Sequence, residues 1–201
     1  MPLRGKTKKD VLVEFRHAEI LEAARRVFAQ KGFEEASVDA IAHSAGVAKG
    51  TLYLYYSSKR DIFWEALKCG LDDLCDRLEE SVRAAGSTEE KIRAFMVTKL
   101  NYFEGNRDFF KFYLAEFSHA VAQQNHAKRV FKECHRRQLR LVMVALKGGM
   151  RQSLPLEATA FAILNLTHGM ITRRLLGWTN STIEEDIAFM FDLTWKGIAG
   201  R

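Results

Sequence analysis

The stretch GTLYLYYSSKRDIF, residues 50–63, decides the fold, because its first half resembles a strand and its second half a helix start. Alternating leucine and tyrosine is the period-two, aromatic-rich pattern of a β-strand. Ser58 and Asp61, however, form a Ser-x-x-Asp capping signature that begins a helix at residue 59. No other segment alternates convincingly, so a strand here would lack a partner. We therefore predict a short separate helix over residues 49–56.

The remaining sequence favours an all-α fold. Only two of the 201 residues are proline, Pro2 and Pro155, so more than 150 consecutive residues lack the strongest helix breaker. The expected helices span residues 10–31, 38–45, 49–56, 59–84, 88–104, 106–121, 126–151, 156–177 and 183–198. We expect an N-terminal three-helix domain over residues 1–58 and a larger C-terminal domain over residues 59–201.

Charge and cysteine content narrow the functional class. The net charge is +6, and the first 60 residues hold eleven Lys and Arg against seven Asp and Glu. The cysteines, Cys69, Cys75 and Cys134, are odd in number and include no C-x-x-C pair, which argues against a disulfide framework. Cys69 and Cys75 would lie on different sides of a helix, which disfavours a redox switch between them. We expect a cytoplasmic protein without a membrane span, because the longest charge-free stretch, residues 158–172, is short and partly polar.

The N-terminal helices have helix-turn-helix spacing. An apolar stripe of period three and four ends before Gly32, which tolerates the positive φ common just past a helix. Ser37 is an N-cap candidate for the next helix, and Gly46 with Val47 makes a tight joint before residue 49. A helix, a short glycine-containing turn and a second helix place a recognition helix in a DNA major groove.

The outward face of the 49–56 helix suits DNA. At 100° per residue, Leu52 and Tyr56 face inward while Gly50 and Leu54 point the opposite way. Leu54 can meet a thymine methyl group.

Polar groups flank that face. The hydroxyls of Tyr53 and Tyr55 suit phosphate oxygens, and Lys49 and Lys59 supply cations at either end. The alternative is that these tyrosines only pack within the protein, and this is the favoured interpretation for Tyr56. The basic arm, residues 4–9, either stays in solvent or reaches toward the DNA.

Residues 17–63, HAEILEAARRVFAQKGFEEASVDAIAHSAGVAKGTLYLYYSSKRDIF, resemble the N-terminal signature of the tetracycline-repressor-like (TetR) family of bacterial transcriptional regulators. Lys-Gly, Ser-Val-x-x-Ile-Ala, Ala-Gly-Val, Lys-Gly-Thr-Leu-Tyr and Ser-Lys occur in the family's order and spacing, over about a quarter of the chain. The resemblance implies a nine-helix protomer, a homodimer, a double-stranded DNA operator, and repression relieved by a small-molecule effector. By position, the implied DNA-binding residues are Ser37, Ala48, Lys49, Gly50, Thr51, Tyr53 and Tyr55, with Lys59 from the following helix. Ala48 replaces a frequent capping Ser or Thr, which removes a cap of about 1 kcal/mol.

The C-terminal half is rich in phenylalanine between residues 95 and 117. Core packing is the default interpretation of each aromatic residue, and the resemblance favours a pocket walled by some of them. Polar side chains in this apolar context need partners when buried and are candidates to orient a ligand. The candidate ligand-binding residues are Phe95, Lys99, Tyr102, Phe103, Phe109, Tyr113, Glu116 and His168.

Metal binding and catalysis lack support. His119, His126 and His135 are spaced across an expected helix break, and no Cys or Asp completes a tetrahedral set. The chain has no nucleophile motif, H-E-x-x-H sequence or phosphate loop. We expect no cofactor, no metal and no enzymatic activity.

The last two expected helices carry more apolar surface than one packing layer needs. A bundle formed by two protomers would use it, and its two-fold axis predicts a palindromic operator. The candidate interface residues are Phe161, Ile171, Ile183, Ile187, Met190 and Thr194.

Three functions are consistent with these patterns. The first is a regulator released from its operator by a small apolar or amphipathic effector. The second is a lipid or acyl-chain binding module whose helix-turn-helix is vestigial. The third is a ligand-independent DNA-binding protein with a solid core, which the absence of an internal cavity would support.

Overall fold

A computed structural model describes residues 8–107 and 126–199, and within these ranges the regular elements are helices plus one isolated bridge between Met150 and Ala199. The expected all-α fold is confirmed for this part of the chain. The expected helix over residues 106–121 and the basic arm fall largely outside it. The helices are α1 (Lys8–Glu35), α2 (Val38–Ser44), α3 (Lys49–Tyr55), α4 (Lys59–Ala84), α5 (Thr88–Gly105), α7 (His126–Leu146), α8 (Leu156–Leu175) and α9 (Ile183–Ile198).

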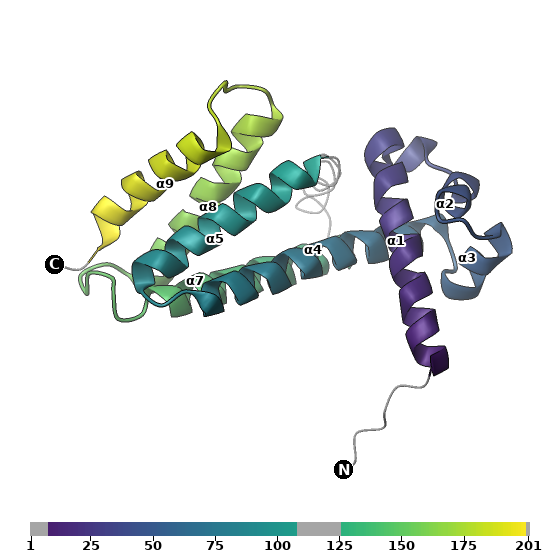
Figure 1. Cartoon of the computed structure of the whole chain (residues 1–201), viewed down its shortest axis with the longest axis horizontal. Helices are drawn as coiled ribbons and strands as arrows, with labels where there is room; N and C mark the ends of the chain where they lie inside the picture. The colour runs from purple at the N-terminus through teal and green to yellow at the C-terminus, as the bar shows by residue number, and fades with distance from the viewer. Residues whose placement is uncertain (1–7, 108–125, 200–201) are drawn as a thin grey trace, which may run out of the picture.

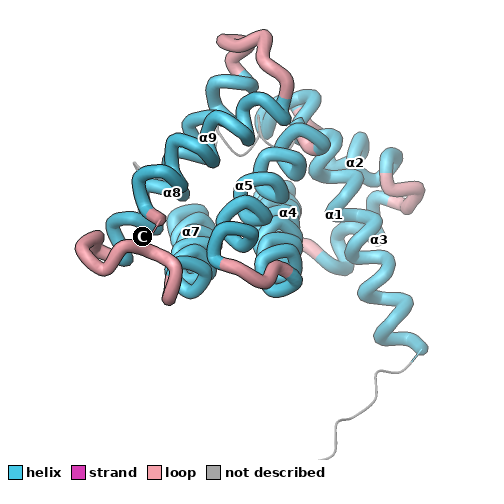
Figure 2. The backbone as a smooth tube through the Cα atoms, turned by 60° about the vertical axis from the view of Figure 1, so that its left-hand side comes forward, coloured by secondary structure: helices cyan, strands magenta, loops and turns pink. Residues whose placement is uncertain are grey.

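The helices form a small N-terminal unit and a larger bundle joined by α4. Figure 1 shows α1, α2 and α3 gathered around the start of α4, whose other end runs between α5 and α7. In Figure 2, α8 and α9 lie on the side of the molecule away from α3. Helix α4 therefore contacts both units.

Glycines with positive φ turn the chain in the N-terminal unit. Gly32 has φ 73° and ψ 175°, so the helical path changes direction there, as expected, and residues 33–35 add a short last turn. Ser37 caps α2, because its side-chain oxygen accepts a hydrogen bond from the Ala40 N–H. Gly46, with φ 65°, lets the chain leave α2 and enter α3 within a few residues.

The segment with alternating leucine and tyrosine is helical. Ser58 accepts a hydrogen bond at 3.1 Å from the Asp61 N–H, and this cap starts α4 as its own element. Tyr56 has extended backbone angles and ends α3. Tertiary packing overrides strand propensity here, since Leu52 inserts fully into the core.

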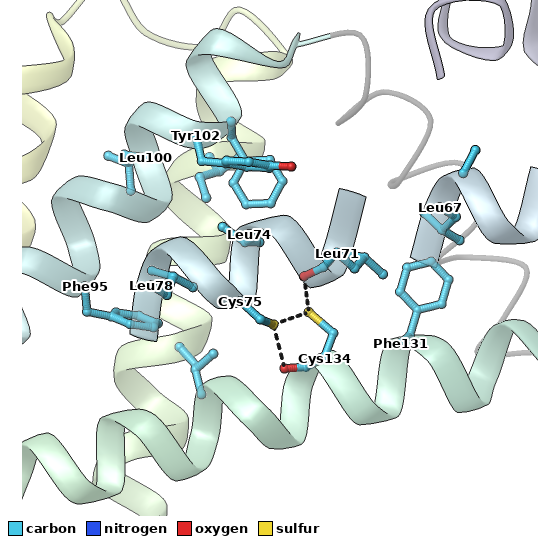
Figure 3. Close-up of a cluster of buried hydrophobic side chains, with 14 of the residues drawn as sticks. Leu67, Leu71, Leu74, Cys75, Leu78, Phe95, Leu100, Tyr102, Phe131 and Cys134 are labelled. Atoms are coloured by element: carbon cyan, nitrogen blue, oxygen red, sulfur yellow. Dashed lines mark hydrogen bonds between the residues drawn. The ribbon is translucent and has the colours of Figure 1, made fainter. Parts of the chain in front are cut away.

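The core runs continuously from one unit to the other along α4. Ile62, Phe63 and Ala66 are buried near the N-terminal unit, and the leucines of the following turns are buried in the bundle. Figure 3 shows these leucines, from Leu67 to Leu78, facing Phe95 and Tyr102 of α5 and Phe131 of α7. A rigid, well-packed α4 follows from this double burial.

The largest difference from the predicted helix boundaries is at the end of α7. The helix expected over residues 126–151 ends at Leu146, because Gly148 has φ 89° and Arg151 turns back to donate its N–H to the Ile198 carbonyl. A Cβ on Gly149 would overlap the Thr88 side chain at the start of α5. The turn after α7 therefore packs closely on the start of α5, which the local sequence pattern does not reveal.

Candidate DNA-binding face and internal cavity

The outward face of α3 is exposed as its helical spacing predicts. The side chains of Leu54 and Tyr53 are 82% and 51% exposed, while Leu52 on the opposite side is fully buried. A Cβ on Gly50 would meet open space, so packing within the protein does not require a glycine there. Because glycine has no side chain, the backbone of α3 is accessible at this position to a large binding partner.

Lys49 has a partner that its sequence position did not suggest. Its ammonium lies 2.8 Å from the Asp39 carboxylate on α2, and both side chains are largely exposed. The hydrogen bond and charge of Asp39 raise the pKa of Lys49. The one lysine of α3 is therefore fixed at the edge of the exposed face, beside an acidic group.

The other tyrosines of this segment pack inward to different degrees. Tyr56 is buried and its hydroxyl lies 3.0 Å from His17 Nδ1 of α1, which agrees with the packing role expected for it. Tyr55 is half-buried, and its ring meets the same imidazole edge-on at 4.5 Å. Of the three tyrosines, only Tyr53 belongs to the exposed surface.

Lys59 holds the preceding turn together. Its ammonium donates hydrogen bonds to the carbonyls of Phe33, Glu34 and Ala36, at 2.7, 3.1 and 3.0 Å. All three ammonium hydrogens are thereby used within the protein. Lys59 thus fixes the end of α1 against the start of α4 and sets the position of α2.

The remaining candidate contacts lie around the N-terminal ends of α2 and α3. Ser37 is exposed and caps α2 as expected, with 3.1 Å between its Oγ and the Ala40 nitrogen. Ala48 gives α3 no side-chain cap, as its apolar side chain implies. Thr51 is half-buried on the first turn of α3.

A cavity of about 110 Å³ lies inside the bundle among α4, α5, α7 and α8. Its wall combines leucines with a group of polar side chains. The lining residues are Leu71, Leu74, Lys99, Phe103, Cys134, His135, Gln138, Leu164, Asn165 and His168.

Lys99 is the main charged group of this wall. The residue is only 4% exposed, and burial lowers the pKa of its ammonium to about 8, so it carries a positive charge at neutral pH. Its Nζ lies 5.5 Å from the centroid of the Phe95 ring. No carboxylate of the described residues pairs with this ammonium.

Two histidines face the same space in neutral form. Burial, followed by the charge of Lys99, lowers the pKa of His168 to about 4, and the same two causes lower the pKa of His135. Gln138 adds a buried side-chain oxygen without a hydrogen-bond partner in the described structure. The cavity therefore offers one cation and several neutral polar groups to whatever occupies it.

The sequence prediction located part of this wall. Lys99, Phe103 and His168 line the cavity, whereas Phe95 is packed in the core and the Tyr102 hydroxyl donates to the Gly70 carbonyl at 2.8 Å. Phe109, Tyr113 and Glu116 lie outside the described residues, as do His119 and the side chain of His126.

The α7 contribution, Cys134, His135 and Gln138, was missed. These residues occupy one turn of a strongly amphipathic helix, and that periodicity was the available signal.

The candidate interface residues occupy both sides of α8 and α9. Ile171, Ile187, Met190 and Thr194 are buried within the protomer, and Ile183 is half-buried. Phe161 is exposed, and the Thr194 hydroxyl donates to the Met190 carbonyl. The large apolar residues exposed on these two helices are Phe161, Phe189 and Leu193, of which the sequence prediction included only Phe161.

None of the described helices is long and apolar enough to cross a membrane. The model of the bacterial regulatory proteins of the tetR family matches residues 20–66. This match covers α2, α3 and the adjoining parts of α1 and α4.

Two curated proteins of Bacillus subtilis (strain 168) are similar to the chain. The uncharacterized HTH-type transcriptional regulator YfiR is 31% identical over 169 residues, which are 80% of each chain. The fatty acid metabolism regulator protein is 34% identical over 84 residues, which are 42% of this chain and 43%, less than half, of that protein.

The fold also matches a solved regulator. The FadR structure from Bacillus subtilis, in complex with stearoyl-CoA, superimposes with a TM-score of 0.73 at 21% identity and covers 90% of this chain and 99% of that chain. The helix-turn-helix geometry and the extent of the match to YfiR agree with this similarity of fold, and together they identify the family of the chain. The chain belongs to the tetR family of bacterial regulatory proteins and is a DNA-binding transcriptional regulator.

Proposed function

We propose that this regulator is a homodimeric repressor, released from a palindromic operator when an amphipathic effector with an anionic group occupies the bundle cavity. The observation that carries the effector part of this proposal is the buried ammonium of Lys99 on the cavity wall. This function implies a cytoplasmic location, because the protein must reach the chromosome.

Residues 1–58 are the proposed DNA-binding domain, and residues 59–201 the proposed effector-binding and dimerisation domain. On the DNA side we assign base-edge and methyl contacts to Leu54 and the surface over Gly50, and phosphate contacts to Lys49 and Tyr53. The flanking contacts are assigned to Ser37, Ala48, Thr51 and Tyr55. We assign Lys59 an indirect role in DNA binding, because its ammonium donates hydrogen bonds to backbone carbonyls around the end of α1 and fixes that segment.

The charge in the cavity suggests the effector class. An isolated buried ammonium is costly unless a negative group or hydrogen-bond acceptors compensate it. A carboxylate or phosphate placed near Lys99 would supply that compensation, and the N–H group of the neutral His135 can donate to its oxygens. The leucines and Phe103 suit the apolar part of the same ligand.

The similar proteins are consistent with this class without defining it. One is named for fatty acid metabolism, and another was solved with stearoyl-CoA. An acyl chain carrying an acidic group is therefore the first effector type to test.

The cavity volume suggests how binding changes the protein. About 110 Å³ is well below the roughly 300–1,000 Å³ of typical ligand sites. An effector with a long apolar part must therefore widen the space between α4 and its neighbours. That movement would bias the protein toward a conformation whose recognition helices are wrongly spaced for DNA.

Two connections can transmit the movement to α3. The first is α4, which is packed in both units. The second is the side-chain contact between Arg25 of α1 and Asn106 at the end of α5, with Nη2 3.3 Å from Oδ1. We assign dimerisation to the exposed side of α8 and α9, at Phe161, Phe189 and Leu193.

The DNA assignment can be tested with duplexes selected from a random pool by the purified protein. Lys49→Ala and Tyr53→Phe should each weaken binding to the selected duplex about tenfold while the protein stays dimeric. Lys147→Ala, an exposed cation in the turn after α7, is the matched control and should bind normally. Unchanged binding by both α3 variants would contradict the assigned face.

The effector assignment can be tested by calorimetry with fatty acids and acyl-CoA esters of graded length. We expect the wild type to bind some of them and to release the selected duplex, and Lys99→Met to bind them at least tenfold more weakly. Ligand binding by a protein that selects no DNA would favour the lipid-binding module instead. Equal binding by wild type and Lys99→Met would refute the role of Lys99.

A further inference from the structure

Two cysteines from distant parts of the chain meet inside the bundle. Cys75 of α4 and Cys134 of α7 are both buried, and their sulfur atoms lie 3.3 Å apart. Figure 3 shows the pair between the two helices, with Cys75 also directed at the Cys134 carbonyl and Cys134 at the Leu71 carbonyl. The third cysteine, Cys69, is exposed elsewhere on α4.

The surroundings of Cys134 distinguish it from an inert core cysteine. The Gln138 side-chain amide lies 3.1 Å from the Cys134 sulfur and can donate to it. Cys134 also lines the cavity, beside the buried ammonium of Lys99. A buried thiol that only fills space needs neither such a donor nor a cation in the same cavity wall.

The two thiols differ in acidity in a way that suits successive reaction. The pKa of Cys134 is lowered, chiefly by the hydrogen bond from Cys75 and then by Gln138, Lys99 and Arg137. The pKa of Cys75 is raised, chiefly by that same hydrogen bond and then by burial. Because the Gln138 amide lies within donating distance of Cys134 and Lys99 lines the same cavity, we assign Cys134 as the thiol that ionises first and Cys75 as its partner.

We propose that Cys75 and Cys134 form a redox modification site, at which a hydroperoxide converts the thiol pair into a disulfide between α4 and α7. The site is separate from the proposed effector function, because it needs no bound effector. It also differs from the pairing that the sequence brought into view, which was between Cys69 and Cys75.

The chemistry proceeds in two balanced steps. The Cys134 thiolate attacks the terminal peroxide oxygen and the O–O bond breaks, leaving a sulfenic acid on Cys134. The departing group is hydroxide for hydrogen peroxide or alkoxide for an organic hydroperoxide, and it takes up a proton to form water or the alcohol. The Cys75 sulfur then attacks the Cys134 sulfur, the S–O bond breaks, and the departing hydroxide takes the Cys75 proton. Overall, two thiols are oxidised to one disulfide, and one hydroperoxide is reduced to water and the corresponding alcohol or, for hydrogen peroxide, to two waters.

The geometry requires little movement. A disulfide has a sulfur–sulfur distance of about 2.05 Å, so the atoms must approach by roughly 1.3 Å from their present separation. Rotation about the side-chain bonds can supply much of this distance. The new bond would close a loop between positions 59 residues apart and so restrict the unfolded chain.

The experiment treats the full-length reduced protein with a slight molar excess of hydrogen peroxide, followed by alkylation and non-reducing peptide mapping. We expect a linked peptide pair containing Cys75 and Cys134 in most chains, with Cys69 still alkylated, and reversal by dithiothreitol. The thermal midpoint of the oxidised protein should rise by several degrees. Recovery of both cysteines as free thiols, or a lowered midpoint after linkage, would overturn the proposal.

Single variants test the order of the steps. Cys75→Ser should stop at a sulfenic acid on Cys134 that dimedone captures, and Cys134→Ser should leave Cys75 as a free thiol. Cys69→Ser is the matched control and should form the same linked pair as the wild type. A sulfenic acid on Cys75, or linkage that requires Cys69, would overturn the assignment; the wild-type map decides the question even if a variant fails to fold.

Discussion

The ammonium of Lys49 lies 2.8 Å from the Asp39 carboxylate, so the single cation of α3 is paired with an acidic group of α2 at the edge of the exposed face. Such an exposed ion pair contributes little to stability, because water screens it. Its consequence concerns DNA, since Asp39 competes with phosphate for Lys49 and adds a negative charge where a duplex would lie.

We therefore expect Asp39→Asn to strengthen binding to the selected duplex severalfold and to make it more salt-dependent. A lysine released from Asp39 can displace one more counterion, which steepens the slope of log affinity against log salt by about one unit. Fluorescence anisotropy at several salt concentrations measures both effects. Weaker binding would mean instead that Asp39 orients Lys49 toward the DNA.

The exposed apolar side of α9 should support the dimer. Leu193→Asp places a charge on a side chain that is 58% exposed in the protomer, and burying that charge against a second copy would be unfavourable. We expect monomers by analytical ultracentrifugation, with loss of palindrome binding. Val144→Asp, at a residue 63% exposed on α7, is the control and should remain dimeric; a dimeric Leu193→Asp would move the interface elsewhere.

The stability of the protein should fall as pH decreases from about 6.5 to 4. The pKa of His168 is lowered to about 4, first by burial and then by Lys99, whereas the unfolded chain has a value near 6.5. Between these values the unfolded state binds a proton that the native state does not, so acid favours unfolding.

Between pH 6.5 and 4, the free energy of unfolding of His168→Gln should fall by roughly 2–3 kcal/mol less than that of the wild type. Urea titrations at each pH measure this difference. Parallel pH profiles for His168→Gln and wild type would show that another group dominates.

Asp186 at the start of α9 is the most heavily partnered buried acid of the described chain. Its carboxylate accepts from Arg174 at 2.8 Å, Ser181 at 2.8 Å and Arg173 at 3.2 Å. Asp186→Asn should lower the free energy of unfolding by about 3 kcal/mol, because a buried pair loses one partner's charge. Asp192→Asn, which breaks the exposed pair with Lys196 on the same helix, should leave stability unchanged.

Local signals predicted the N-terminal unit well, because caps and turns act over a few residues. Ser58 identified α4 as a separate helix, and Gly46 located the joint before α3. The partners of Lys49 and Lys59 were not predictable, since they depend on how α2 and α1 pack.

The cavity was only partly predictable for the same physical reason. Lys99 and His168 were noticed because polar residues are conspicuous in apolar stretches, whereas Cys134 has an ordinary local context. Its proximity to Cys75 arises from the packing of α4 on α7. Likewise, the side chain of Thr88, far away in the sequence, leaves no room for a Cβ at Gly149 in the turn after α7.

Because α4 is long, a small rotation at one of its ends produces a large displacement at the other. Its 26 residues extend about 39 Å, so pivoting by about 5° at one end displaces the other by about 3 Å. Adjacent major grooves on one side of a duplex repeat every 34 Å or so, and an error of that size in each half of a dimer would spoil the match. A movement of about an ångström beside Leu71 and Leu74 can thus determine whether the dimer stays bound to DNA or dissociates from it.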